Sequence, residues 1–360
     1  MTTDVEELEK INLSEDDNSE VPPSDIVAYN ELRSCADLFR LYNDKVLDIH
    51  PDFQRDIVWN PEKQTRFIDS LIKQLPIPSL CLTLDYKTEK RIVIDGLQRI
   101  QSIINFLDES EDWKLAKLED IDERISDKKV SEIKEKNSFL IERVKNAVLP
   151  ITILRCDLSK ESHANYLFTI FHRLNSGGTA LNNQEIRNAI YSGNFNNFLK
   201  EANQYKKWRV ITGIDDNEKS NRFLKEELIL RFFAFFEHQN QYTGKLAKFL
   251  NNYMHENRKI SENILADKSY YFYKTVDLIF DKITNGNVMD RTTNTIVEAI
   301  MVGVAKNLDK LSGEANEKVK TLYDKILNSD SFSQENLAYG LSGKEKVNNR
   351  LNTSINLFSE

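Results

Sequence analysis

The hydrophobic pattern of this chain changes near residue 190, and this change restricts the fold more than any other feature. Before it, short apolar runs typical of strands occur at 46–49, 80–84, 91–94 and 149–154, with helical patterns between them. After it, apolar residues recur almost throughout with the 3.6-residue spacing of helices. The pattern therefore predicts an α+β N-terminal domain at 26–195 and an all-helical domain at 196–360.

Several helices in the expected N-terminal domain have recognisable start signals. Ser34 is expected to cap a helix within 32–41, and Asn60 followed by Pro61 is expected to open a helix that stops before residue 76. The runs at 80–84 and 91–94 predict a hairpin, and the charge-dense segment 109–145 predicts solvated helices or an insertion. Apolar spacing predicts further helices at 97–107, 165–174, 179–191, 224–236, 246–253, 270–283, 295–308 and 319–327.

The first 25 residues form an acidic tail. They contain nine acidic residues and one lysine, which accounts for the whole net charge of −8. We expect this tail to be disordered, and we expect the neutral remainder to have no overall field that attracts nucleic acid. The tail also lacks the apolar stretch of a secretory signal, and no run approaches the ~20 apolar residues of a membrane span. A cytoplasmic protein without a membrane partner is expected.

The common sequence motifs of metal and nucleotide sites are missing. The three cysteines, Cys35, Cys81 and Cys156, have no paired spacing, so neither a disulfide scaffold nor a zinc finger is predicted. The five histidines are scattered and give no metal-binding spacing. Neither the P-loop nor the G-x-G-x-x-G pattern occurs.

A polar cluster lies where the strand at 91–94 meets the helix at 97–107. Asp95 and Gly96 form the junction, and Gln98 and Arg99 fall in the first helical turn. The free N–H groups and positive dipole end of a helix attract phosphate, and Gly96 would let a ligand approach the backbone. Because a cation in the first turn opposes the dipole, Arg99 needs a partner: Asp95, a triphosphate, or a metal held by Asp95. The alternative is ordinary helix capping by Asp95.

Two further clusters break local patterns. Gln54 and Arg55 lie between apolar residues, beside Trp59. The segment from Arg173 to Gly178 is followed by Glu185 and Arg187. Each also has a plain interpretation: the glycines can simply end a helix, and Glu185 with Arg187 can be a surface pair worth well under ~1 kcal/mol.

One basic stretch includes an aromatic residue. Lys206, Lys207, Trp208 and Arg209 could form a local groove for DNA, or they could be a solvated helix end.

Taken in order, these blocks resemble the GmrS-type family, catalogued as domain of unknown function 262. The similar segments are Phe-Gln-Arg at 53–55, Val-Ile-Asp-Gly-Leu-Gln-Arg at 93–99, and Ile-Phe-His-Arg-Leu-Asn-Ser-Gly-Gly at 170–178 with Glu-Ile-Arg-Asn-Ala at 185–189. The resemblance covers roughly 32–191. It implies a ParB/sulfiredoxin-like fold with a small mixed sheet. It also implies binding and hydrolysis of nucleoside triphosphates, and a role in defence against phage that often involves sensing modified DNA.

The resemblance assigns roles to individual residues. Asp95, Gln98 and Arg99 are the expected catalytic residues, and Asp95 is the expected ligand of a Mg²⁺ ion that accompanies the nucleotide. The expected nucleotide-binding residues are Gln54, Arg55, Gly96, Arg173, Asn175, Gly177 and Gly178.

The chain departs from the family pattern at two places. Leu97 replaces a glutamine of the motif, which puts turnover in question. No histidine follows His255, so the C-terminal His-Asn-His nuclease of many relatives is not expected here. The resemblance thus implies a nucleotide-binding, hydrolysing sensor or regulator of an anti-phage or restriction system. The alternative is a non-hydrolytic nucleotide- or DNA-binding module that gates a partner nuclease; the oligomeric state is left open.

Overall fold

The computed structural model describes residues 22–49, 59–174, 182–214, 222–290, 293–337 and 340–360. Contacts between residues divide the chain into two units. The N-terminal unit spans Glu20–Leu181, and the helical unit takes in Asn182–Glu360. Residues 182–195, which the hydrophobic pattern assigns to the first domain, belong by their contacts to the helical unit. Most of the acidic tail lies outside the described residues.

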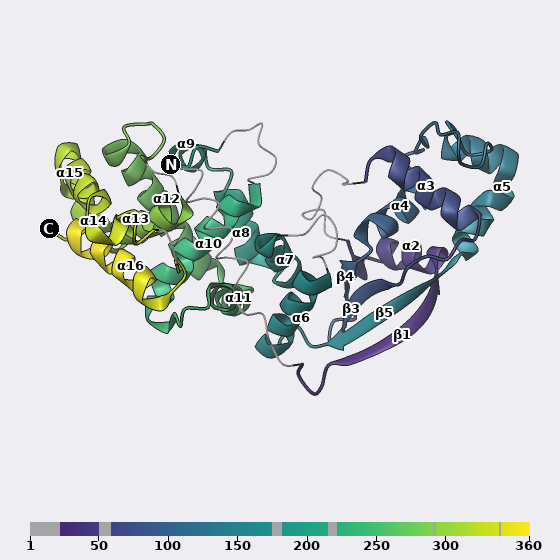
Figure 1. The fold of residues 1–360 in the computed structure, drawn as a ribbon, viewed down its shortest axis with the longest axis horizontal. Coiled ribbons are helices and arrows are strands. Elements are labelled where there is room, and N and C mark those ends of the chain that lie inside the picture. Colours follow the sequence, from purple (N-terminus) through teal and green to yellow (C-terminus); the bar gives the residue numbers. More distant parts are fainter. Residues whose placement is uncertain (1–21, 50–58, 175–181, 215–221, 291–292, 338–339) are drawn as a thin grey trace. The chain divides into compact units, whose positions relative to one another are not determined.

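The N-terminal unit is built on a mixed five-stranded sheet (Figure 1). Its strands are β1 (Val27–Ser34), β2 (Leu47–Asp48), β3 (Leu80–Asp85), β4 (Arg91–Asp95) and β5 (Val148–Cys156), in the order β1-β5-β3-β4-β2. β3 and β4 form the expected antiparallel hairpin, while β3 pairs parallel with β5. The α+β prediction with a small mixed sheet is therefore confirmed.

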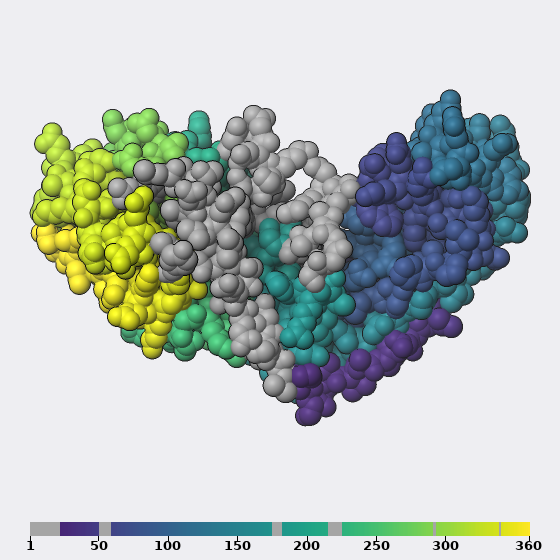
Figure 2. All heavy atoms as spheres, viewed as in Figure 1, coloured from purple at the N-terminus to yellow at the C-terminus, as the bar shows by residue number. Residues whose placement is uncertain are grey.

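Strand β1 was not expected, and the helix placed at 32–41 begins later. The helix is α2 (Cys35–Asn43), and Ser34 caps it by accepting a hydrogen bond from the Asp37 N–H at 3.1 Å. β1 pairs along its whole length with β5, but most of its residues are exposed. An edge strand exposed in this way has no alternation of buried and exposed residues, so the sequence carries no strand signal. Figure 2 shows β1 as a strip along the surface, coloured purple.

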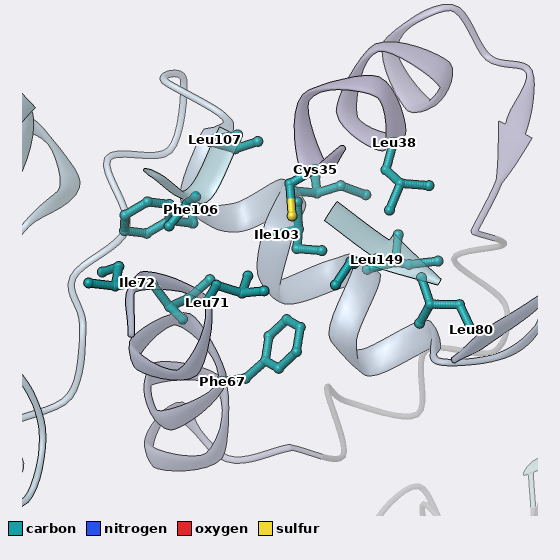
Figure 3. Packing of buried hydrophobic residues seen from close by; sticks show 14 of the residues in the cluster. Cys35, Leu38, Phe67, Leu71, Ile72, Leu80, Ile103, Phe106, Leu107 and Leu149 are labelled. Carbon is teal, nitrogen blue, oxygen red and sulfur yellow. The ribbon is translucent and has the colours of Figure 1, made fainter. Parts of the chain in front are cut away.

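The core of this unit lies where helices cover the sheet (Figure 3). The helices are α2, α3 (Pro61–Ile72), α4 (Leu97–Leu107) and α5 (Val130–Asn146). Asn60 caps α3 through its side chain, with Pro61 at the first position, as expected. The core side chains include Cys35, Leu38, Phe67, Leu71, Ile103, Phe106 and Leu149.

Segment 109–145, for which solvated helices or an insertion were expected, also contributes to the core. Part of this segment folds as α5, and apolar residues spread through it are buried in the core: Leu115, Ile121, Ile125, Val130, Ile133, Leu140, Ile141 and Val144. The segment looks solvated in sequence because its charged residues outnumber these core residues. The helical spacing of the core residues is therefore hard to recognise.

The helical unit contains helices only, among the residues described. They are α7 (Asn183–Ile190), α8 (Asn194–Ala202), α9 (Lys206–Ile211), α10 (Arg222–His238), α11 (Leu246–Asn257), α12 (Glu262–Leu278), α13 (Asn294–Lys306), α14 (Leu308–Gly313), α15 (Asn316–Leu327) and α16 (Lys344–Phe358). Two short 3-10 helices, η4 (Gln239–Gln241) and η6 (Asp330–Phe332), lie between them, and the π-helical segment η5 (Ile279–Ile283) continues α12. The all-helical prediction for this part is confirmed.

Helix α13 is the centre of the helical unit. Every residue from Thr295 to Ala305 is buried, and α10, α12 and α16 pack around the helix. A Cβ atom on Gly303 would lie 2.1 Å from the Ser354 Oγ of α16, so a glycine is needed for this close approach.

Candidate functional site

The strand-to-helix junction at Asp95 and Gly96 is present as predicted. Asp95 ends β4, and Gly96 precedes α4 in the left-handed conformation with φ of 95°. No side chain caps the helix, so the interpretation of Asp95 as an ordinary cap is wrong. A Cβ atom on residue 96 would lie 2.2 Å from Leu80 Cδ2. Both the backbone conformation and the contact with β3 therefore require glycine here.

Arg99 binds the residues around this junction. Its Nη2 atom donates to Asp95 Oδ2 at 2.8 Å and to the Ser79 carbonyl at 3.4 Å, and its Nη1 atom donates to the Pro78 carbonyl at 2.5 Å. The Arg99 side chain is 12% exposed, whereas that of Asp95 is 45% exposed. Asp95 is thus a partner of Arg99. Through these bonds Arg99 holds the residues just before β3 against the end of β4.

Gln98 joins the junction to the start of another predicted cluster. Its Oε1 atom accepts a hydrogen bond from the Trp59 N–H at 3.3 Å, which leaves the amide Nε2 to donate elsewhere. Trp59 also packs edge-on against Phe67, and its carbonyl accepts from Gln64. Trp59 closely follows Gln54 and Arg55 in sequence; those two residues lie outside the described residues.

The downstream cluster is only partly described. Arg173 is exposed in the last turn of α6 (Glu161–Leu174), a helix that packs against β4. Asn175, Gly177 and Gly178 lie outside the described residues. Among the predicted site residues, the structure thus brings Asp95, Gly96, Gln98 and Arg99 together.

Leu97, which replaces the motif glutamine, packs partly buried against the hydrophobic core of the N-terminal unit. It therefore has a packing role in this chain.

Among the described residues, no group of three or more His, Cys, Asp or Glu side chains is arranged to hold a metal ion. Asp95 alone can still contribute one ligand to a Mg²⁺ ion. Mg²⁺ in nucleotide sites is commonly held by one or two carboxylates together with phosphate oxygens and water. The half-exposed Asp95 carboxylate can supply one such ligand.

Glu185 and Arg187 do not form the surface pair that one interpretation predicted. Glu185 completes a capping box at the start of α7, where its Oε2 atom accepts from the Asn182 N–H at 2.6 Å. Arg187 is 1% exposed; its Nη1 atom donates to Glu227 Oε2 at 2.8 Å and its Nε atom to Asn251 Oδ1 at 2.9 Å. The sequence could not reveal this, because Glu227 and Asn251 are distant from Arg187 along the chain.

Glu227 lies between two buried guanidinium groups. Its Oε1 atom accepts from Arg231 Nη2 at 2.7 Å, and Arg231 also approaches Glu298 at 3.7 Å. Burial raises the pKa of the Glu227 carboxyl, but Arg231 and Arg187 outweigh it and hold that pKa below its ordinary value. Burial lowers the pKa of Arg187, which still stays cationic because an arginine pKa ordinarily exceeds 12. These four residues form a buried ionic network linking α7, α10 and α13.

The basic stretch at 206–209 is not arranged as a groove with an exposed aromatic. Trp208 is fully buried against Phe272, with its indole N–H donating to Asn203. Lys207 is bound by Asp277 at 3.0 Å and Asp281 at 3.1 Å. Trp208 is thus a core residue and Lys207 is neutralised.

The helical unit also has an open cleft of about 600 Å³ between η5 and α15. None of the residues lining it is a predicted site residue.

Comparison with known proteins gives one match. Residues 35–192 match the family model described as the N-terminal domain of the GmrSD restriction endonuclease. Curated proteins and solved structures yielded no match. No helix within the described ranges combines the length and apolar character needed to cross a bilayer. The family match indicates a component of a restriction or anti-phage system. Residues 35–192 of this chain are thus similar to the N-terminal domain of the GmrSD restriction endonuclease.

Proposed function

We propose that the junction of β4 and α4 binds the phosphate groups of a nucleoside triphosphate and that the chain hydrolyses this nucleotide. In this proposal the chain is a sensor or regulator of a restriction or anti-phage system. The observation that carries the proposal is a helix N-terminus without a side-chain cap, opened by a left-handed glycine and placed beside the Arg99–Asp95 pair.

The first turn of α4 has the properties of an anion site. The first N–H groups of a helix have no partner within the helix, and their dipoles add to a partial positive charge. Among the residues that the structure describes, no side chain caps α4, so these donors can serve a ligand. The missing Cβ atom of Gly96 makes room for Leu80 and Arg99, so the groups offered to a phosphate are the N–H groups of the first turn.

The surrounding side chains can assist in distinct ways. Arg99 supplies positive charge beside the phosphates and holds Asp95 in place. Gln98, whose Nε2 atom remains a donor, can orient a water molecule or a phosphate oxygen. Asp95 would hold Mg²⁺, which supplies charge neutralisation on the phosphates. In hydrolysis, a water oxygen bonds to the terminal phosphorus atom, and the bond between this phosphorus and the bridging oxygen breaks.

A second candidate function is binding without hydrolysis, with the nucleotide or DNA controlling a partner nuclease. Leu97 favours it, because this residue packs against the core where relatives have a glutamine. The Oε1 atom of Gln98 is also occupied by Trp59. Fewer polar groups are then available to orient an attacking water molecule.

Arg99→Ala is expected to reduce phosphate release at least ~100-fold, because removing one donor that stabilises a transition state commonly costs that much. The measurement is phosphate release from four nucleoside triphosphates with Mg²⁺. The control is Arg40→Ala, which removes an exposed arginine of α2 in the same unit. Equal release by wild type, Arg99→Ala and a blank would rule out the enzyme. Calorimetric binding of a triphosphate without release would then support the second candidate.

A further inference from the structure

Four side chains form a row across the sheet that ends at Asp95. In the strand register, Asn30 of β1 pairs with Thr152 of β5, Thr152 pairs with Cys81 of β3, and Cys81 pairs with Asp95 of β4. Directly paired residues place their side chains on the same face of a sheet. These four residues, Asn30, Thr152, Cys81 and Asp95, are named here the transverse row.

The transverse row lies on the face of the sheet that the core helices do not cover. Its members are partly or fully exposed, whereas the alternate residues of β5, Ile151 and Ile153, are completely buried. On the same face, the next pair along β1 and β5 is Leu32 with Pro150, and Leu32 is 74% exposed. A polar row is thus bordered by accessible apolar surface.

Hydrogen bonds connect the row to Arg99. The Thr152 hydroxyl donates to Asn30 Oδ1 at 3.0 Å and lies 3.4 Å from the Ser79 hydroxyl. The Ser79 carbonyl in turn accepts from Arg99 Nη2 at 3.4 Å, and the same nitrogen contacts Asp95. The row and the candidate phosphate site are therefore one connected polar surface.

We propose that the transverse row binds the sugar and base of the nucleotide whose phosphates lie at the start of α4, with Asn30 and Thr152 as the specificity-determining residues. The proposal rests on the proposed function. Three steps between strands of ~4.8 Å each give about 14 Å from β4 to β1, which suits an extended nucleotide.

The chemistry of Asn30 fits this role. Its Oδ1 atom already accepts from Thr152, so its Nδ2 atom is directed to serve as a donor. Such a donor recognises a carbonyl oxygen or an unprotonated ring nitrogen of a base. The flat base ring would pack on Leu32 and Pro150, because apolar contact with a ring excludes water.

The test compares two ligands by calorimetry: a nucleoside triphosphate and inorganic tripolyphosphate, which lacks sugar and base. For the double variant Asn30→Ala, Thr152→Val, we expect about a tenfold weaker Kd for the nucleotide and an unchanged Kd for tripolyphosphate. Arg99→Ala should weaken both ligands. The control is Asn43→Ala, an exposed asparagine at the end of α2, which should change neither.

Cys81 provides a second readout that does not depend on these substitutions. Among the three cysteines it alone is partly exposed, and the other two are buried. Because the Cys81 side chain is only partly exposed, its alkylation should be slow and easily timed. Bound nucleotide should slow alkylation of Cys81 at least about fivefold.

Each outcome decides a different point. Nucleotide binding that is unaffected by Asn30→Ala, Thr152→Val, with Cys81 unprotected, would overturn the transverse row and leave the phosphate site standing. No binding of any triphosphate by the wild type would overturn both. An equal loss for nucleotide and tripolyphosphate would show that the double variant disturbs the phosphate site, which also contradicts the proposal.

Discussion

Arg187→Ala is expected to lower the free energy of unfolding of the helical unit by about 3–5 kcal/mol, the usual cost of removing one partner of a buried ion pair. Arg187 is almost fully buried and donates to both Glu227 and Asn251. Its removal leaves the Glu227 carboxylate with Arg231 alone and opens a cavity. The lost ion pair and the cavity both lower the free energy of unfolding.

The chain offers a built-in probe for this measurement. Trp208 is buried in the helical unit, while the other two tryptophans, Trp59 and Trp113, belong to the N-terminal unit. Replacing Trp59 and Trp113 by phenylalanine makes urea unfolding, followed by fluorescence, specific to the helical unit. Lys318→Ala, which removes the exposed partner of an ion pair with Glu314, should change the free energy of unfolding little. An Arg187→Ala loss as small as this control would contradict a stabilising network.

Gly96→Ala is expected to destabilise the N-terminal unit by about 2–5 kcal/mol. The left-handed backbone costs a residue with a Cβ atom about 1–2 kcal/mol, and forcing an extra carbon into a packed site costs about 1–3 kcal/mol. Both costs apply, because φ is 95° and the new atom would lie 2.2 Å from Leu80 Cδ2.

Two comparisons separate these costs. Gly340 also has a positive φ, of 59°, but a Cβ atom added there would meet no other atom within 4 Å, so Gly340→Ala should show the backbone cost alone. In a Leu80→Ala background the contact is relieved, and the added effect of Gly96→Ala should fall to the same size. Hydrogen exchange in peptides from β3 and β5 reports on the N-terminal unit for the Gly96 variants, and exchange in peptides from α16 reports on the helical unit for Gly340→Ala. An additive double variant would mean that the Leu80 contact does not contribute.

Local signals were enough to predict much of the fold. Asn60 with Pro61, Ser34, and the junction at Asp95 and Gly96 are decided by neighbouring residues, and each lies where the sequence indicates. β1 could not be predicted, since an exposed edge strand has no buried face to produce alternation. The core residues of segment 109–145 could not be recognised, because they are few among many charges.

The candidate site shows the same division. Arg99 and Asp95 are four residues apart across a helix start, so their contact could be anticipated. The bonds from Arg99 to the Pro78 and Ser79 carbonyls, and from Trp59 to Gln98, join residues 20 to 39 positions apart. The transverse row depends on strand register, and its outermost member lies on the strand that the sequence did not reveal.

The boundaries of the family match differ from those of the folded units, and this difference affects the choice of a fragment to express. A fragment of residues 35–192 would lack β1. The backbone N–H and C=O groups of β5 would then be unpaired, and β5 would become an exposed edge strand that is prone to aggregation. The fragment would also contain α7 without Glu227 and Asn251, so Arg187 would lose a carboxylate partner and an amide partner. A fragment of residues 22–181 follows the N-terminal unit instead and keeps the pairing of β1 with β5.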